Sequence, residues 1–156
     1  MKRKCFIASP FFCPEEVERI DKIQKLLTDH GFDFFSAKEE CYFQPDAEGK
    51  ISETDKRNVF KNDCAGIDSS DFMIVIGGSR IHTDPDNPYK GYDTGTFIEM
   101  GYALARRMPI IYFNESNDGL KRNLMIAGAA HFYARTFDDL VTIISLMDQS
   151  YGEDVE

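Results

Sequence analysis

Two carboxylates flank a turn of small residues in the segment YDTGTFIEMGYALARR, residues 92–107. Asp93 precedes the turn, and Glu99 follows it in an apolar stretch that predicts a helix. Because the neighbours of Glu99 are apolar or small, we expect partial desolvation to raise its pKa, whereas a helix N-terminus would lower it. Gly95 allows a ligand to approach the backbone closely. Glu99 is therefore a candidate for catalysis.

The same acids have an ordinary structural explanation. Thr96 to Glu99 matches a capping box, in which a hydroxyl is followed three residues later by a glutamate, and Asp93 is also a suitable N-cap. From the local pattern alone, capping by Glu99 is the better explanation. A third acid, Asp63, falls within a predicted helix, where a solvated side chain is the usual outcome. Asn123 stands at a predicted helix start, where asparagine is a common cap.

The composition of the 156 residues is that of a globular protein with a net charge of −9. Such a surface repels polyanions, so nucleic acid is not an expected partner. No segment is apolar enough to span a bilayer, and the N-terminal segment predicts a strand, not a signal peptide. Histidines and cysteines are scattered, so we expect no metal and a cytosolic location with reduced thiols. Each cysteine is expected to be a buried apolar side chain, namely Cys5, Cys13, Cys41 and Cys64.

Apolar runs alternate with segments of helical periodicity along the whole chain. Strands are predicted at 4–9, 32–35, 72–78, 109–113 and 131–134, and helices at 14–31, 53–71, 92–107, 123–130 and 137–150. The helix at 53–71 should bury an apolar side formed by Val59, Phe60, Cys64 and Ile67. This alternation predicts an α/β fold, a single-domain flavodoxin-like or Rossmann-like sandwich. It would have about five parallel strands with helices on both faces, over residues 1–150, and an acidic tail at 151–156.

Ligands of such sheets bind at the carboxyl ends of the strands. The segments that follow the predicted strands are 9–12, 36–54, 77–96 and 114–123. The long polar segment 36–54 is predicted to be a functional loop. The chain has no dinucleotide fingerprint, no triphosphate-binding loop and no serine nucleophile elbow, so an enzyme of nucleoside triphosphates is not expected.

Four segments, in order along most of the chain, resemble the nucleoside 2-deoxyribosyltransferases. They are KCFIASPFF, NVFKNDCAGIDSSDFMIVI, DTGTFIEMGYALARRMPII and NLM. The resemblance implies that Glu99 is a nucleophile that forms a covalent deoxyribosyl ester, with retention of configuration after a second base attacks. It implies 2'-deoxynucleosides and free nucleobases as substrates, no cofactor, and a homo-oligomer with sites shared between subunits.

Further roles follow from the same resemblance. Asp93 and Asp63 match carboxylates placed at the nucleobase, and one of them would protonate the leaving base, although which one stays open. Asn123 matches a residue that contacts the 5'-hydroxyl across a subunit interface, and Met125 ends the same motif. The pocket would also be lined by Ser9, Pro10 and Phe11.

One departure from the family pattern concerns Phe6. It occupies the position where the family commonly has a tyrosine that hydrogen-bonds the glutamate, and the candidate replacements are Tyr102, Tyr112 and Tyr42. Two alternative functions stay open. One is hydrolysis of 2'-deoxynucleoside 5'-monophosphates, although the turn after the first strand has no arginine for a phosphate, and Arg80, Arg106 or Arg107 would have to supply one. The other is a binding module without turnover, against which the presence of the three acids together with Asn123 argues.

Overall fold

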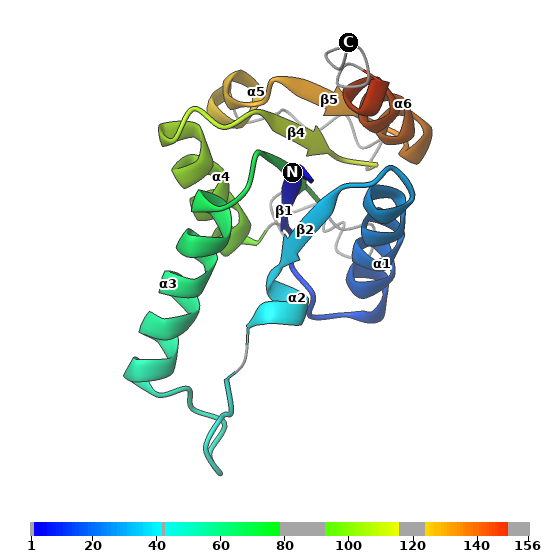
Figure 1. Cartoon of the computed structure of the whole chain (residues 1–156). Helices are drawn as coiled ribbons and strands as arrows, with labels where there is room; N and C mark the ends of the chain where they lie inside the picture. The colour runs from blue at the N-terminus through cyan, green and yellow to red at the C-terminus, as the bar shows by residue number, and fades with distance from the viewer. Residues whose placement is uncertain (1, 42, 79–92, 116–123, 150–156) are drawn as a thin grey trace.

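The protein forms one parallel sheet of five strands in the order β2–β1–β3–β4–β5 (Figure 1). The computed structural model describes residues 2–41, 43–78, 93–115 and 124–149. The strands are β1 (Lys4–Ala8), β2 (Asp33–Ser36), β3 (Phe72–Ile76), β4 (Ile110–Phe113) and β5 (Phe132–Ala134). This is the flavodoxin-like strand order, and it confirms the predicted fold class.

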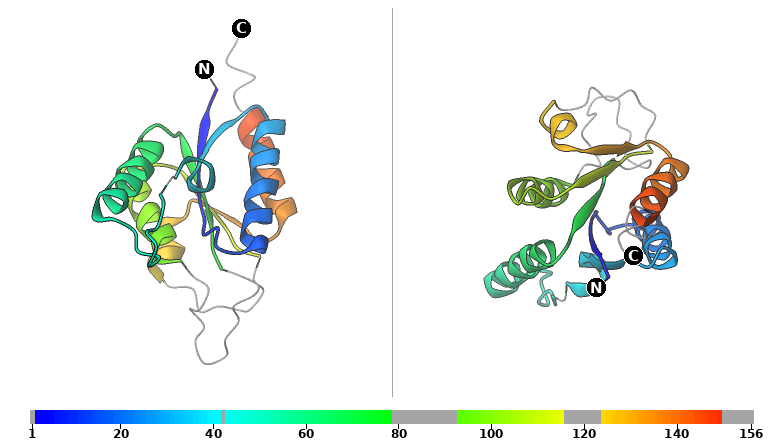
Figure 2. Two further views of the ribbon diagram at one scale, coloured as in Figure 1. Left: turned by 90° about the horizontal axis from the view of Figure 1, so that it is seen from below. Right: turned by 45° about the horizontal axis from the view of Figure 1, so that its top comes forward.

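Helices cover both faces of the sheet (Figure 2). The helices are α1 (Pro14–Asp29), α2 (Ala37–Glu40), α3 (Glu53–Asp68), α4 (Thr94–Ala105), α5 (Leu124–Ala129) and α6 (Phe137–Gln149). α1 and α6 lie on one face, and α3, α4 and α5 lie on the other. None of the helices in the described ranges is long and apolar enough to cross a membrane.

Successive residues of β1 point to opposite faces and so divide the core into two layers. Cys5 and Ile7 pack against α1 and α6, whereas Phe6 and Ala8 pack against α3 and α4. β3 lies next to β1 and is buried along its whole length. A central parallel strand is expected to be this apolar, because helices cover both of its faces.

The segment 36–54 contains the short helix α2, and its role as a functional loop stays a prediction. Two expectations about local structure are wrong. Phe60 is 59% exposed, and the buried residues of α3 are only Gly66 and Ile67, because the N-terminal half of this helix extends beyond the sheet (Figure 1). Of the four cysteines, which are all free, only Cys5 lies in the core, and the other three are half-buried.

The carboxyl ends of β1 and β3 form the switch point of the sheet. The chain leaves β1 through α1 on one face and returns through α3 on the other face before it enters β3. In folds of this kind, the crevice beyond these strand ends is where ligands bind. Ser9 and Gly77 directly follow these two strands.

Candidate active site

The helix α4 begins at Thr94 and is capped by Asp93, not by a capping box at Glu99. Asp93 Oδ2 accepts a hydrogen bond from the Thr96 backbone N–H at 2.8 Å and another from Thr96 Oγ1 at 3.0 Å. Glu99 lies in the second turn, too far along the helix to reach the cap. The local capping explanation of Glu99 is therefore wrong, because the helix begins three residues earlier than a Thr96 cap requires.

Gly95 makes room for the cap itself. A Cβ atom at this position would lie 3.0 Å from Asp93 Oδ2. That distance is shorter than ordinary van der Waals contact, so a side chain at Gly95 would require the capping carboxylate to shift by a few tenths of an ångström. The sequence suggested that a ligand approaches the backbone at Gly95. In the structure, the Asp93 side chain occupies that position.

Glu99 is a partly buried carboxylate beside two other acids. Burial, together with the smaller effect of the charges of Asp63 and Asp93, raises its pKa to about 8. Within the described part of the chain, no side chain donates a hydrogen bond to Glu99 and no cation pairs with it. Desolvation and like charges therefore outweigh the helix N-terminus, one of whose backbone N–H groups, that of Thr96, is bound by Asp93.

Asp63 lies on α3 and is half-buried, so it is not the solvated helix residue that the local pattern suggested. Burial raises the pKa of Asp63, and a hydrogen bond from the Cys41 thiol partly opposes that rise. The thiol donates to Asp63 Oδ1 at 3.2 Å. Cys41 follows α2, so this bond joins the segment after β2 to α3. Sequence reasoning did not identify Cys41, because the two residues are distant along the chain.

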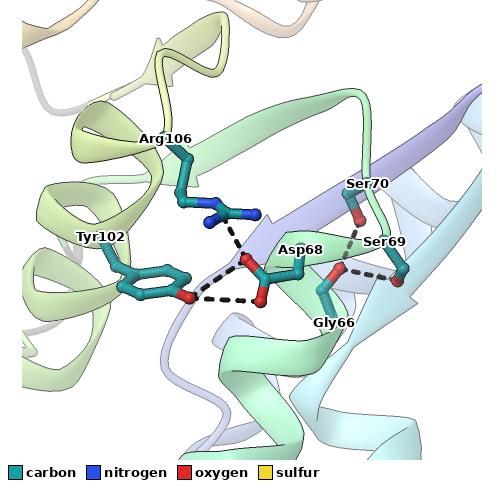
Figure 3. A network of polar contacts seen from close by, with 6 residues as sticks. All are labelled: Gly66, Asp68, Ser69, Ser70, Tyr102 and Arg106. Carbon is teal, nitrogen blue, oxygen red and sulfur yellow. Dashed lines mark hydrogen bonds and ion pairs between the residues drawn. The ribbon is translucent and has the colours of Figure 1, made fainter.

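A polar network fixes α3 against α4 (Figure 3). Asp68 accepts hydrogen bonds from the Tyr102 hydroxyl at 3.1 and 3.2 Å, and its Oδ1 pairs with Arg106 Nε at 3.0 Å. Behind it, Ser69 and Ser70 donate to the Gly66 carbonyl at the end of α3 (Figure 3). The network joins the two helices that carry Asp63 and Glu99.

The segment after β1 presents one aromatic ring to solvent. Ser9 is buried and donates to the Pro10 carbonyl at 2.9 Å, and Pro10 is also buried. Phe11 packs against the core beside α1 and stacks on Phe12 with ring centroids 5.3 Å apart. Phe12 is 76% exposed. Within the segment 9–12, the exposed aromatic is thus Phe12, one residue beyond those that the resemblance selected.

Phe6 is part of the core beneath α4. It is fully buried and stacks on Phe35 with centroids 5.1 Å apart, in the same apolar cluster as Met100. Of the hydroxyls considered as replacements for the family tyrosine, that of Tyr102 binds Asp68. That of Tyr112 lies at Gly77, where an added Cβ would be 2.0 Å from it. Tyr42 lies outside the described residues.

Two further predicted positions follow β4. Asn123 lies outside the described residues, and Met125 is 79% exposed near the start of α5. The preceding Leu124 is 87% exposed.

A buried cation on α1 was not anticipated from the sequence. Arg19 is only 7% exposed, and its Nη1 donates to the Gly78 carbonyl at 3.0 Å. Its Nε and Nη2 are buried and have no hydrogen-bond partner among the described residues. An arginine on an amphipathic helix is ordinarily exposed, so no local signal marks this one. In the same described ranges, no three His, Cys, Asp or Glu side chains converge to hold a metal ion.

A model of the nucleoside 2-deoxyribosyltransferase family matches residues 5–141 of the chain. The protein therefore belongs to the nucleoside 2-deoxyribosyltransferase family. Among solved structures, the chain is similar to the 2-deoxyribosyltransferase of the psychrotolerant bacterium Bacillus psychrosaccharolyticus, with 30% sequence identity and a TM-score of 0.70. This likeness covers 88% of the present chain and 90% of the other.

Two more distant structures share the fold. The CMP N-glycosidase of Clostridium botulinum is 17% identical, with a TM-score of 0.61, over 92% of this chain and 99% of that one. The 2-deoxyribosyltransferase of Leishmania mexicana is 19% identical, with a TM-score of 0.59, over 92% and 97% of the two chains. No curated protein matches the chain in sequence. The family indicates an enzyme that acts on the N-glycosidic bond of nucleosides.

Proposed function

We propose that this protein transfers 2-deoxyribose from one nucleobase to another through a covalent ester on Glu99. The observation that carries the proposal is the partly buried carboxylate of Glu99, which pairs with no cation among the described residues and lies within the electrostatic reach of Asp63 and Asp93. The family to which the chain belongs supports the same reaction. A carboxylate that is poorly solvated and unpaired is a strong nucleophile toward an electrophilic carbon.

The three acids together can hold the proton that the reaction needs. Because the pKa of Glu99 is raised to about 8, the cluster retains a proton at neutral pH. In the first step, a Glu99 carboxylate oxygen bonds to the anomeric carbon and the bond from that carbon to the base breaks. The electron pair leaves with the base, whose ring nitrogen takes the proton from Asp63 or Asp93. For this step, the proton must lie on an aspartate while Glu99 is ionised.

The second step reverses the first with a different base. A ring nitrogen of the acceptor attacks the anomeric carbon, its proton returns to the acid cluster, and the Glu99 carboxylate leaves. Two displacements at one carbon retain the original configuration. No cofactor takes part, because each step balances with one proton and one nucleophile.

The test is base exchange. The protein is incubated with 2'-deoxyinosine or thymidine, with and without free adenine or cytosine, and the products are separated by chromatography. We expect a new deoxynucleoside only when a free base is added. Glu99→Ala should abolish exchange while the far-UV circular dichroism stays unchanged, and Glu48→Ala, which alters an exposed glutamate, should exchange normally. A folded Glu99→Ala protein with near-normal exchange would refute the nucleophile assignment.

One observation favours a second candidate, hydrolysis of deoxynucleoside 5'-monophosphates. Arg19 brings a buried guanidinium to the carboxyl end of β3, with two donor groups that have no partner among the described residues. A phosphate could use such donors. The neighbouring Glu15 and Glu16 on the same helix oppose an anion there. Release of free base from a monophosphate, with no exchange on nucleosides, would favour this candidate.

We also propose that the enzyme is a homo-oligomer. The apolar side chains of Ile98, Leu104, Leu124 and Met125 are exposed on α4 and α5, beside the proposed site. Exposed apolar residues that gather on neighbouring elements are typical of protein interfaces. Sedimentation or light scattering would test the assembly, and a monomer with full exchange activity would contradict it.

A further inference from the structure

The environment of Asp63 includes a side chain to which the proposed reaction gives no role. Cys41 lies at the end of α2, is half-buried, and donates a hydrogen bond from its thiol to Asp63 Oδ1 at 3.2 Å. This distance is well within the range for a hydrogen bond that involves sulfur. The bond occupies one oxygen of a carboxylate that would otherwise turn freely about its side-chain torsions.

We propose that Cys41 is a positioning residue of the active site, whose thiol holds the Asp63 carboxylate in the orientation in which it serves the nucleobase beside Glu99. This inference rests on the proposed function. The titratable groups that face Asp63 are Cys41 after α2, Glu99 on α4 and the adjacent Cys64 on α3. Of the two cysteines, only Cys41 has a hydrogen bond to the carboxylate among the described residues.

The chemistry of the thiol suits a fixed donor and does not suit a nucleophile. Burial raises the pKa of Cys41 to about 12, and the neighbouring Asp63 contributes to the rise. A thiol with this pKa stays protonated throughout the neutral range, so it donates its proton without being reactive. As a weak donor, it orients the carboxylate while opposing only part of the rise in the pKa of Asp63.

A second contact supports the same arrangement. Asn62, which precedes Asp63 on α3, donates from Nδ2 to the Glu40 carbonyl at 2.9 Å. The backbone just before Cys41 is therefore tied to α3 independently of the thiol. Removal of the thiol should leave this tie in place, so that a variant at Cys41 tests the orientation of the carboxylate without releasing the segment.

The first arm of the test compares Cys41→Ala, Cys41→Ser and the control Cys64→Ala in base exchange. A hydrogen bond to a charged group is commonly worth roughly a factor of ten. We expect kcat to fall about tenfold in Cys41→Ala and to recover in Cys41→Ser, whose hydroxyl also donates, while Cys64→Ala stays near the wild type. Because the thiol lowers the pKa of Asp63, the limb of the pH–rate profile that belongs to Asp63 should move to higher pH in Cys41→Ala.

The second arm needs no turnover. Iodoacetamide alkylation of Cys41 is followed by peptide mass spectrometry in the wild type and in Asp63→Asn, across the alkaline pH range. Because Asp63 raises the pKa of the thiol, we expect Cys41 to be alkylated faster in Asp63→Asn and Cys13, as an internal reference, to be unaffected. An unchanged alkylation rate would show that the pair does not form, and this would overturn the inference.

The two arms separate this inference from the proposed function. If the wild type exchanges bases and Cys41→Ala does so with the same kcat and pH profile, the positioning role is wrong and the proposed function stands. Equal losses in Cys41→Ala and Cys41→Ser would also overturn it, because shape and not the donor would then matter. If the wild type exchanges no base, the proposed function fails and the inference fails with it.

Discussion

Glu99 should destabilise the folded protein at alkaline pH, and Glu99→Gln should remove that cost. The pKa of this carboxyl is raised from 4.5 to about 8, chiefly by burial. Between these two values the unfolded chain is ionised at this position while the folded chain is protonated. The folded state thus binds the extra proton, and its stability falls as the pH rises through this range. The destabilisation is complete above the folded pKa.

The size of the effect follows from the shift. Each pKa unit corresponds to about 1.4 kcal/mol, so the full shift corresponds to about 5 kcal/mol. Solvent reaches part of the carboxylate and screens its charge, which reduces the effect to an expected 2 to 3 kcal/mol, roughly. Glutamine has nearly the same shape and cannot ionise. Glu99→Gln should therefore match the wild type near about pH 5 and exceed its free energy of unfolding by that amount near about pH 9.

Urea unfolding followed by circular dichroism at several pH values measures this difference. Glu48→Gln is the matched control, because it removes the charge of an exposed glutamate and should stay parallel to the wild type. If the Glu99→Gln and wild-type stabilities differ by a constant amount at all pH values, the carboxylate is not perturbed. The proposal that Glu99 and the two aspartates share a proton at neutral pH would then be wrong, whatever the activity of the variant.

Three further changes separate structural from chemical roles. Asparagine can also cap a helix, so Asp93→Asn should keep its thermal stability but lose most base exchange. The loss of exchange should be smaller with a substrate whose activated leaving group needs no proton. Asp93→Ala should in addition lose about 1 kcal/mol of stability in urea unfolding. Equal loss of Asp93→Asn on both substrates would indicate a structural role. Gly77→Ala would place a methyl group 2.0 Å from the Tyr112 hydroxyl, and we expect urea unfolding to show a loss of about 1–3 kcal/mol. Tyr102→Phe removes the hydroxyl that binds Asp68 and should lower kcat with little change in KM; unchanged steady-state kinetics would show that the contact between α3 and α4 is not needed.

The order of strands and helices could be predicted from the sequence because it depends on local properties. The continuous apolar run at Phe72–Ile76 is buried on both faces, as such runs are in parallel sheets. Pro14 begins α1, and Gly31 follows its end with φ 77, a conformation that glycine adopts without strain. The helix at 53–71 was also predicted, but its buried side was not. The apolar periodicity of this helix could not show that Phe60 lies beyond the edge of the sheet and is therefore exposed.

For the candidate site too, local features could be predicted from the sequence and contacts between distant residues could not. The acid–TG–acid segment marked Asp93 and Glu99 in the sequence, yet local pattern favoured the wrong capping residue. That choice depended on where α4 begins, and the structure places its first residue at Thr94. The bond between Cys41 and Asp63, and the burial of Arg19 against Gly78, left no local signal at all.

The sequence by itself thus determined which side chains are available for chemistry and which elements carry them. Only the tertiary structure decided that Asp63 from α3 and Glu99 from α4 share one partly desolvated space, and therefore that the pKa of Glu99 rises to about 8. The physical reason is that desolvation and the interaction between charges depend on distance in space. Those distances are set by how α3 and α4 pack on the sheet and against each other, through contacts such as that between Asp68 and Tyr102.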